Sequence, residues 1–248
     1  MCGRYASTRR PEDMAGLFRA DAPPPEEALP PSWNVAPTDD VWAVIERVDR
    51  TTGEIERRLR AARWGLVPSW AKDLSIGAKM INARVETVHD KPAYRRPFLK
   101  RRCLLPADGF YEWQAVPARD GAKAYKQPYF IHPEDQAPMA FAGLYEFWRD
   151  PKAADDEAAV WWTTCTIITT EATDAAGRVH PRMPLTIAEP NFGAWLDPAL
   201  EDPDEIRALL ADPRARPLDA RAVTTAVNNV RNNGPHLLDA APPTQSAG

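Results

Sequence analysis

The sequence predicts an α+β fold in a single domain, because segments typical of strands outnumber the short, scattered segments typical of helices. The 248 residues include 26 prolines, which interrupt long helices, and 44% hydrophobic residues, which suffice for a large core. Neither an internal repeat nor a change in composition divides the chain into two cores. We therefore expect neither a coiled coil, nor a helical bundle, nor a disordered chain.

The first elements are a helix and a hairpin. A helix is expected over residues 9–19, where Pro11 suits the first turn and acidic residues follow it. The proline-rich residues 22–31 are expected to form an extended surface linker. Residues 41–48 and 55–66 are typical of two strands joined by a polar turn, which predicts a β-hairpin.

Most of the remaining elements are predicted strands. Residues 103–113 contain two strands around a turn at Asp108 and Gly109. Residues 160–170 are the clearest strand because they are rich in β-branched and aromatic residues. The further elements are strands at 128–132 and 139–148, a loop at 149–159, a helix at 203–211 and a strand at 223–227. The domain is expected to end at residue 239, before a disordered tail over 240–248.

Charge and cysteine content narrow the classes of function. The formal net charge of −4 argues against a generally basic coat, although a local basic cleft is compatible with it. The three cysteines include no Cys-x-x-Cys and no histidine pair has ligand spacing, so neither a disulfide framework nor a metal site is expected. No apolar run approaches the ~20 residues of a membrane span, and the N-terminus does not read as a signal peptide, which predicts a cytoplasmic protein.

Cys2 is the most informative candidate for chemistry. Removal of Met1 would leave a terminal cysteine that carries both an α-amine and a thiol. An α-amine titrates at about 7.7–8.0, so much of it can be neutral at neutral pH and can attack an aldehyde to form a Schiff base. The thiol can then close on the imine to give a thiazolidine. Position alone favours an ordinary second residue of a flexible terminus, and the residues around Cys2 favour the chemical role.

Two neighbouring motifs carry groups that suit a nucleic acid. Arg4 follows Cys2 and Gly3 and offers a planar fork for a phosphate. In the segment NARVET, Asn82 can orient an amine and Arg84 can hold a phosphate, although a capped turn also explains this segment.

The segment RWGLVPSW contains two further candidates, Trp64 and Trp70. Either indole could stack on a base, which contributes ~1–3 kcal/mol in single-strand binding. For one of the two, the hydrophobic core is the better interpretation.

Glu112 and His180 are candidate proton-transfer groups. Glu112 lies between aromatic residues on a predicted strand, and apolar neighbours raise the pKa of a carboxyl toward the range of a general acid or base. A solvent-facing glutamate on an edge strand is the alternative. His180 lies in a rigid loop, HPRMP, of the kind that positions catalytic groups, and a structural histidine is the alternative.

A basic run over residues 91–102 contains six basic residues and no acidic one. It includes Arg95 and Arg96, and its aromatic residues Tyr94 and Phe98 are interleaved with the charges. Such a run is usually a solvated face. Its place in an otherwise acidic chain, just before Glu112, favours a patch that faces nucleic acid.

Nine segments, in one order along nearly the whole chain, resemble the SOS response-associated peptidase family, also called abasic-site processing proteins. They are MCGRY (1–5), WNVAPT (33–38), RWGLVPSW (63–70), NARVET (82–87), RRCLLPADGFYEW (101–113), FAGLYEFW (141–148), TIITTEA (166–172), HPRMP (180–184) and VTTAVNNVRNNGP (223–235). Asn233 stands where an acidic residue is expected in many relatives, which leaves its role open.

The resemblance implies a barrel-like, mainly antiparallel β core flanked by short helices. It implies a monomer, without cofactor or metal, that binds single-stranded DNA containing an abasic site in the DNA damage or SOS response. The site's aldehyde would be captured covalently by Cys2, protecting the lesion, with abasic-site lyase activity and peptidase self-processing as further activities. Bound to DNA, the protein would be associated with the nucleoid.

The resemblance also implies a role for each candidate. Asn82 would position the N-terminus, Glu112 would act as acid and base in opening the sugar, and His180 would assist these proton transfers. The residues implied to bind DNA are Arg4, Trp64, Trp70, Arg84, Arg95 and Arg96.

Three other functions remain open. A cysteine peptidase could use Cys2 with His180 and Glu112, acting only to remove Met1. A non-covalent reader of single-stranded or modified DNA could use the basic run and tryptophans. An ordinary cytosolic enzyme with a small substrate is the third, although no glycine-rich nucleotide motif is present.

Overall fold

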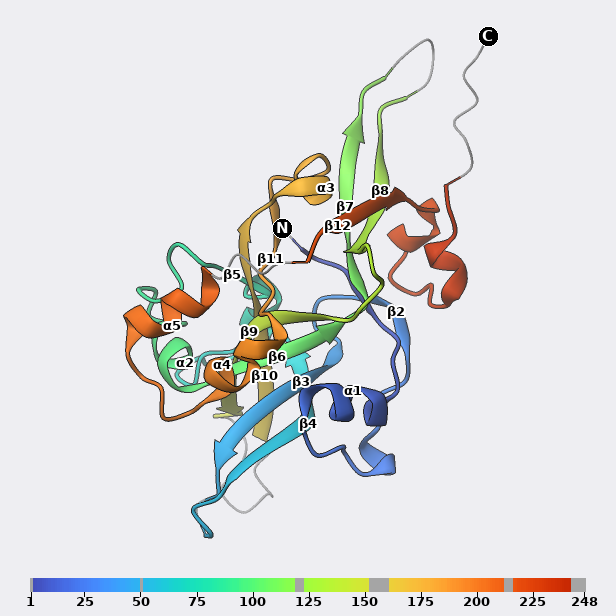
Figure 1. The fold of residues 1–248 in the computed structure, drawn as a ribbon. Coiled ribbons are helices and arrows are strands. Elements are labelled where there is room, and N and C mark those ends of the chain that lie inside the picture. Colours follow the sequence, from blue (N-terminus) through green and yellow to red (C-terminus); the bar gives the residue numbers. More distant parts are fainter. Residues whose placement is uncertain (1, 50, 119–122, 152–160, 212–215, 242–248) are drawn as a thin grey trace.

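Five strands close into a barrel at the centre of the computed structural model, which describes residues 2–49, 51–118, 123–151, 161–211 and 216–241 (Figure 1). The strands are β3 (Asp40–Val48), β4 (Ile55–Trp64), β6 (Arg102–Ala107), β9 (Met139–Arg149) and β10 (Trp161–Glu171). β3 pairs with β4 and β6, β6 with β9, and β9 with β10, all antiparallel. The parallel pairing of β10 with β4 closes the ring. The predicted α+β fold with a barrel-like, mainly antiparallel core is confirmed.

A second sheet packs beside the barrel and carries the start of the chain. Its strands, in spatial order, are β12 (Leu218–Ala222), β8 (Tyr125–Pro133), β7 (Gly109–Val116), β1 (Tyr5–Ser7) and β2 (Ser32–Val35). β7 and β8 form a long hairpin that extends away from the barrel (Figure 1). Two three-residue strands, β5 (Asn82–Arg84) and β11 (Arg182–Pro184), pair with the C-terminal end of β10.

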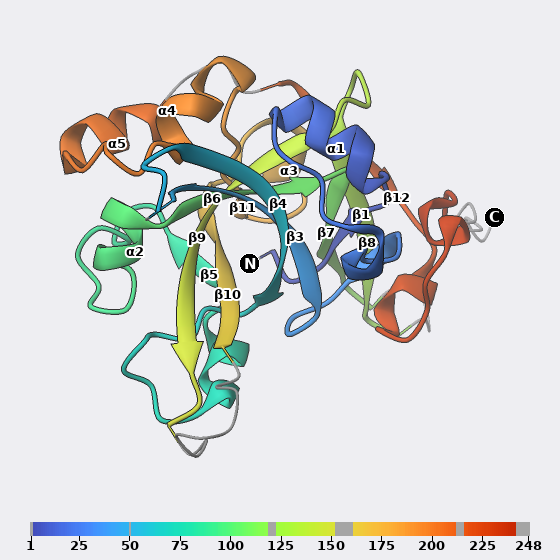
Figure 2. The ribbon, with the colours of Figure 1, turned by 90° about the horizontal axis from the view of Figure 1, so that it is seen from below.

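The helices are short, as the proline content predicts. They are α1 (Pro11–Phe18), α2 (Arg95–Lys100), α3 (Asp174–Gly177), α4 (Phe192–Leu196) and α5 (Pro203–Leu210), with 3₁₀ turns at Pro25–Glu27, Leu74–Lys79, Glu189–Asn191, Thr225–Asn228 and Pro235–Leu238. α2, α4 and α5 gather on one side of the barrel, and α1 lies elsewhere on its surface (Figure 2). Asp202 caps α5 by accepting hydrogen bonds from the N–H groups of Asp204 and Glu205.

Most elements expected from the sequence are present, and one expected strand is wrong. Residues 223–227, expected to form a strand, do not form one, because β12 ends at Ala222. The Thr224 side chain accepts a hydrogen bond from the N–H of Ala226 and starts a 3₁₀ turn. The tail is folded through Ala241, whose N–H donates to the carbonyl of Ala222. The remaining tail residues, 242–248, and most of the expected loop at 149–159 lie outside the described residues.

Arg102 is the most unusual residue of the core, because its side chain is charged and only 2% exposed. Burial lowers its pKa to about 10. Its guanidinium donates to five backbone carbonyls, those of Phe98, Leu99, Trp195, Asp197 and Leu200. Arg102 therefore joins β6 to α2 and to the segment around α4, and it does not contribute to a basic surface.

Candidate functional site

The N-terminal segment runs between the barrel and the second sheet, which buries Cys2 completely. β1 is held on one side by β2 and on the other by β7, where the N–H of Tyr111 donates to the carbonyl of Arg4. Asn82 reaches Cys2 from β5, and its Nδ2 donates to the Cys2 carbonyl oxygen at 2.7 Å. The chain start is thus fixed from two sides.

The thiol of Cys2 is neutral at physiological pH. Burial raises its pKa far above the ordinary value, and the nearby Glu112 carboxylate raises it further. The Sγ–H group points toward the carbonyl oxygen of Arg4, with Sγ 3.8 Å from it. A buried, protonated thiol differs from the exposed thiolate of a reactive cysteine.

Glu112 and His180 meet beside Cys2. Glu112 projects from β7 with 4% of its surface exposed, and burial raises the pKa of its carboxyl, opposed in part by the positive charge that His180 can carry. Nδ1 of His180 lies 3.8 Å from Oε1 of Glu112. The structure therefore brings Cys2, Asn82, Glu112 and His180 together from four different segments of the chain.

An open pocket of about 470 Å³ reaches two members of this cluster, Glu112 and His180, and its other lining residues are Trp113, Lys126 and Asn228. Nε1 of Trp113 donates to Oδ1 of Asn228 at 2.6 Å, which fixes the indole at the pocket wall. Lys126 and Asn228 are not among the residues that the sequence predicts for the site. The register of β8 against β7 places Lys126 opposite Ala115, within the lining of the pocket that contains Glu112, and this register is not visible in a single sequence.

Arg4 is partly committed to the fold. Its Nη1 donates to Oδ1 of Asn34 at 2.7 Å and to the carbonyl of Val227 at 2.9 Å. Asn34 also donates to several carbonyls of the segment 227–232. Asn233, whose role was left open, binds the backbone of Pro31 and Trp33, so it helps to hold the same segment against β2. Among the other arginines, Arg84 is exposed at the end of β5.

The two tryptophans of RWGLVPSW have opposite environments, and the stacking role predicted for Trp64 requires correction. Trp64 is 0% exposed, packs edge-on against Tyr5 and donates from Nε1 to the carbonyl of Ile81 at 2.9 Å. A base cannot reach this ring, so Trp64 is a core residue. Trp70 is 65% exposed and has the surface that stacking requires.

The basic run forms a smaller surface than its sequence suggests. Arg95 and Arg96 are exposed on α2 and line a separate pocket between α2 and α5. The end of the run is neutralised or buried: Lys100 pairs with Glu201, Arg101 pairs with Glu146, and Arg102 is in the core. Neither Arg95 nor Arg96 lines the pocket that contains Glu112.

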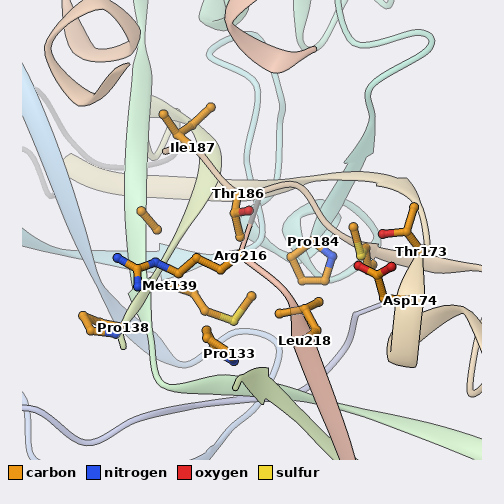
Figure 3. Close-up of a pocket in the computed structure, with 12 residues that line it drawn as sticks. Pro133, Pro138, Met139, Thr173, Asp174, Pro184, Thr186, Ile187, Arg216 and Leu218 are labelled. Atoms are coloured by element: carbon orange, nitrogen blue, oxygen red, sulfur yellow. The ribbon is translucent and has the colours of Figure 1, made fainter. Parts of the chain in front are cut away.

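A third hollow lies between α3, β11 and β12, and its lining is mainly apolar (Figure 3). Met139, Met183, Pro184 and Leu218 are among its apolar lining residues, and Arg216 and Asp174 are among its polar ones. None of the predicted site residues lines it, so it is separate from the Cys2 cluster.

Within the described ranges, no group of three or more His, Cys, Asp or Glu side chains could hold a metal ion. No helix in the same part of the chain is long and apolar enough to cross a membrane.

Comparisons with known proteins identify one family. A family model described as SOS response associated peptidase (SRAP) matches residues 1–230. The chain is 40% identical over 240 residues to the abasic site processing protein YoaM of Bacillus subtilis, covering 97% of this chain and 98% of that protein. It is 34% identical to the abasic site processing protein HMCES of Gallus gallus over 233 residues, covering 84% of this chain and 66% of that protein.

The fold also has counterparts among solved structures. A protein from Bacteroides thetaiotaomicron superposes with a TM-score of 0.75 at 23% identity, covering 97% of this chain and 100% of that one. A phage-related protein from Bordetella bronchiseptica superposes with a TM-score of 0.64 at 29% identity, covering 90% of this chain and 94% of that one.

Proposed function

Because the chain belongs to the SOS response-associated peptidase (SRAP) family, we propose that it binds single-stranded DNA at an abasic site and captures the lesion covalently through Cys2. The observation that carries this proposal is the convergence of Asn82, Glu112 and His180 on a buried Cys2. Relatives named for abasic-site processing support the DNA lesion as the substrate. The open form of an abasic sugar is an aldehyde, and a terminal cysteine is suited to react with it.

The proposed reaction has two bond-forming stages. After Met1 is removed, the neutral α-amine of Cys2 adds to the aldehyde carbon, and the carbinolamine loses water to give an imine. The thiol then adds across the C=N bond, with sulfur bonding to carbon and its proton passing to nitrogen. The product is a thiazolidine ring that joins the protein to the DNA.

The neighbouring side chains supply what these stages need. A carboxyl with a raised pKa, such as that of Glu112, can protonate the departing hydroxyl and accept the proton back. His180 can exchange protons with Glu112. Oδ1 of Asn82 is buried without a hydrogen-bond partner among the described residues, while Nδ2 of the same amide holds the Cys2 carbonyl. Oδ1 is therefore available to the Cys2 amine.

The protonated thiol also bears on the peptidase alternative. A cysteine peptidase needs a thiolate at neutral pH, whereas burial and Glu112 raise the pKa of Cys2. In the proposed reaction the amine attacks first, and a neutral thiol delivers both the sulfur and the proton that close the ring. The state of Cys2 therefore favours aldehyde capture over peptide hydrolysis.

The direct test combines intact mass with denaturing electrophoresis. Protein verified to lack Met1 is mixed with a single-stranded oligonucleotide that contains one abasic site, beside the same oligonucleotide without it. We expect a denaturation-resistant adduct whose mass is that of protein plus DNA minus one water. An adduct that forms equally with undamaged DNA, or none at all, would remove the proposed function.

Replacing Glu112 with Gln is expected to slow adduct formation by about a hundredfold or more, since general acid–base groups contribute about 10²–10⁴ in rate. Single-turnover gels at saturating DNA measure this rate. A variant that reacts at the wild-type rate would show that Glu112 transfers no essential proton.

The same variant should be more stable than wild type at alkaline pH. Burial raises the Glu112 pKa, so the stability associated with its neutral form is complete below the ordinary carboxyl pKa and is lost as pH rises through the raised value. Glutamine stays neutral, so thermal unfolding at pH 8 should occur at a higher temperature in Glu112→Gln. The difference should shrink toward pH 4, and a variant destabilised at pH 8 would contradict this account.

Trp70→Ala is expected to weaken binding of undamaged single-stranded DNA by about 5- to 150-fold, equivalent to ~1–3 kcal/mol of lost stacking. Trp161, at the start of β10, is a matched control because it is a comparably exposed indole: it is 62% exposed, against 65% for Trp70. Fluorescence anisotropy at fixed salt measures both variants. Equal losses in Trp70→Ala and Trp161→Ala would mean that Trp70 has no specific contact with DNA.

A further inference from the structure

An ion pair between Glu86 and Arg182 lies at the edge of the Cys2 cluster. Nη1 and Nη2 of Arg182 donate to Oε1 and Oε2 of Glu86 at 2.5 and 3.1 Å. This two-point contact fixes the direction of the guanidinium as well as its distance. Hydrogen bonding from Arg182 lowers the pKa of Glu86, so the carboxylate stays charged throughout the neutral range.

The Glu86–Arg182 ion pair connects the two short strands that flank the C-terminal end of β10. β5 pairs with β10 on one side, with Arg84 opposite Thr169, and β11 pairs with it on the other, with Arg182 opposite Glu171. Glu86 follows β5, and the Arg182 side chain reaches it after donating from Nη2 to the Thr169 carbonyl at 2.6 Å. The pair therefore ties the strand that carries Asn82 to the strand that follows His180.

The backbone of Arg182 is the anchor of the His180 ring. Nδ1 of His180 lies 3.0 Å from the N–H nitrogen of Arg182 and 3.1 Å from its carbonyl oxygen. An unprotonated Nδ1 accepts from that N–H, and a protonated Nδ1 donates to that carbonyl. The backbone of Arg182 can therefore hold the His180 ring whether Nδ1 is protonated or not. A residue that both donates and accepts a proton needs this. The backbone on either side of Arg182 is also held, since the N–H of His180 donates to the Ala176 carbonyl and the Pro181 carbonyl accepts from the N–H of Ala172.

From this geometry we infer that Glu86 is a positioning residue for proton transfer: through Arg182 it holds the backbone that orients His180 toward Glu112. The inference rests on the proposed function, because it concerns the same reaction. The other charged group that lines the pocket beside His180 is Lys126 from β8. Glu86 itself is half exposed and takes no part in the reaction.

Glu86→Gln and Glu86→Asp test this role, with Glu56→Gln as a matched control. Glu56 also pairs with an arginine, Arg58, at 2.8 Å, but on β4 outside the site. We expect Glu86→Gln to lower the single-turnover rate of adduct formation about tenfold, because small displacements of catalytic groups cost large factors in rate. Glu86→Asp, which keeps the charge, should recover most of this loss, and Glu56→Gln should react like wild type.

Two further measurements separate positioning from DNA binding. Long-range ¹H–¹⁵N NMR of the imidazole nitrogens, assigned with His180→Gln, reports how the His180 ring is hydrogen bonded without any DNA present. Its signals should shift in Glu86→Gln and return toward wild type in Glu86→Asp. Anisotropy with undamaged single-stranded DNA should show affinity that is unchanged or tighter, since Arg182 loses its partner and can turn to a phosphate.

The rate, the His180 signals and the DNA affinity together decide whether Glu86 positions His180. A slower rate with altered His180 signals and retained DNA affinity supports it. Wild-type signals in Glu86→Gln, or a loss of DNA affinity that accounts for the slower rate, overturns it. If the wild-type protein forms no adduct, the proposed function fails, and the NMR comparison still tests whether Glu86 orients His180.

Discussion

Cys2→Ser is expected to abolish the heat-stable adduct with abasic DNA while still forming an imine that borohydride can trap. The serine variant keeps the α-amine and the Asn82 contact to the Cys2 carbonyl, so the first bond can form. A hydroxyl is a far weaker nucleophile than a thiol toward an imine, so the ring does not close. The imine then hydrolyses or leads to strand cleavage by β-elimination. We expect a loss of stable adduct of about a thousandfold or more, equivalent to ~4 kcal/mol.

The measurement compares the two products on denaturing gels, with and without borohydride. Cys2→Ala is the control, since it keeps the amine and has no side-chain nucleophile, and it should behave like Cys2→Ser. Mass spectrometry must first verify that Met1 is absent from all three proteins, because a retained methionine would mask the amine. A full-strength, heat-stable adduct in Cys2→Ser would rule out the thiazolidine.

Arg102→Met is expected to be among the most destabilising single substitutions in the chain. Methionine keeps the length of the side chain but removes the donors that satisfy five backbone carbonyls. Each buried carbonyl left without a partner costs ~1–3 kcal/mol, and partial relaxation lowers the sum. We expect a loss of at least about 3 kcal/mol in the free energy of unfolding.

Urea denaturation followed by tryptophan fluorescence measures this loss. Arg60→Met is the matched control, because Arg60 lies on the outside of β4 and is exposed. The control should stay within about 0.5 kcal/mol of wild type. A loss below about 1 kcal/mol in Arg102→Met would mean that water replaces the guanidinium at these carbonyls.

The sequence predicts the long strands well and the short ones poorly. β10 and the β3–β4 hairpin have enough β-branched and aromatic residues to be recognised without knowledge of their partners. β5 and β11 have three residues each, and they form strands because they pair with the two edges of β10. The sequence does not predict α2, because a proline such as Pro97 usually interrupts a helix. Pro97 lies in the first turn of α2, where a proline removes no hydrogen bond of the helix.

The candidate site residues can be predicted from their sequence motifs, whereas the extent to which each side chain is buried cannot. Trp64 and Trp70 occur in one motif, but Trp64 ends β4 and Trp70 lies after the chain has turned at Gly65. The φ of Gly65 is +136°, and a Cβ there would come within 2.6 Å of the Gly77 backbone. Trp64 points inward because it ends β4 on the same face as the buried Ala62. Lys126 and Asn228 carry no motif-level signal, because only the packed sheet brings them to the pocket.

The contact between Arg4 and the Val227 carbonyl joins residues that are 223 positions apart. During synthesis, the chain start is therefore made first but acquires its final environment last. The ribosome must release β7, the loop with His180 and nearly all of the C-terminal segment before Arg4 can find this partner. A chain truncated before residue 227 would lack the carbonyl that holds Arg4, two positions from Cys2. The topology thus makes completion of translation a condition for anchoring the segment that carries the reactive terminus.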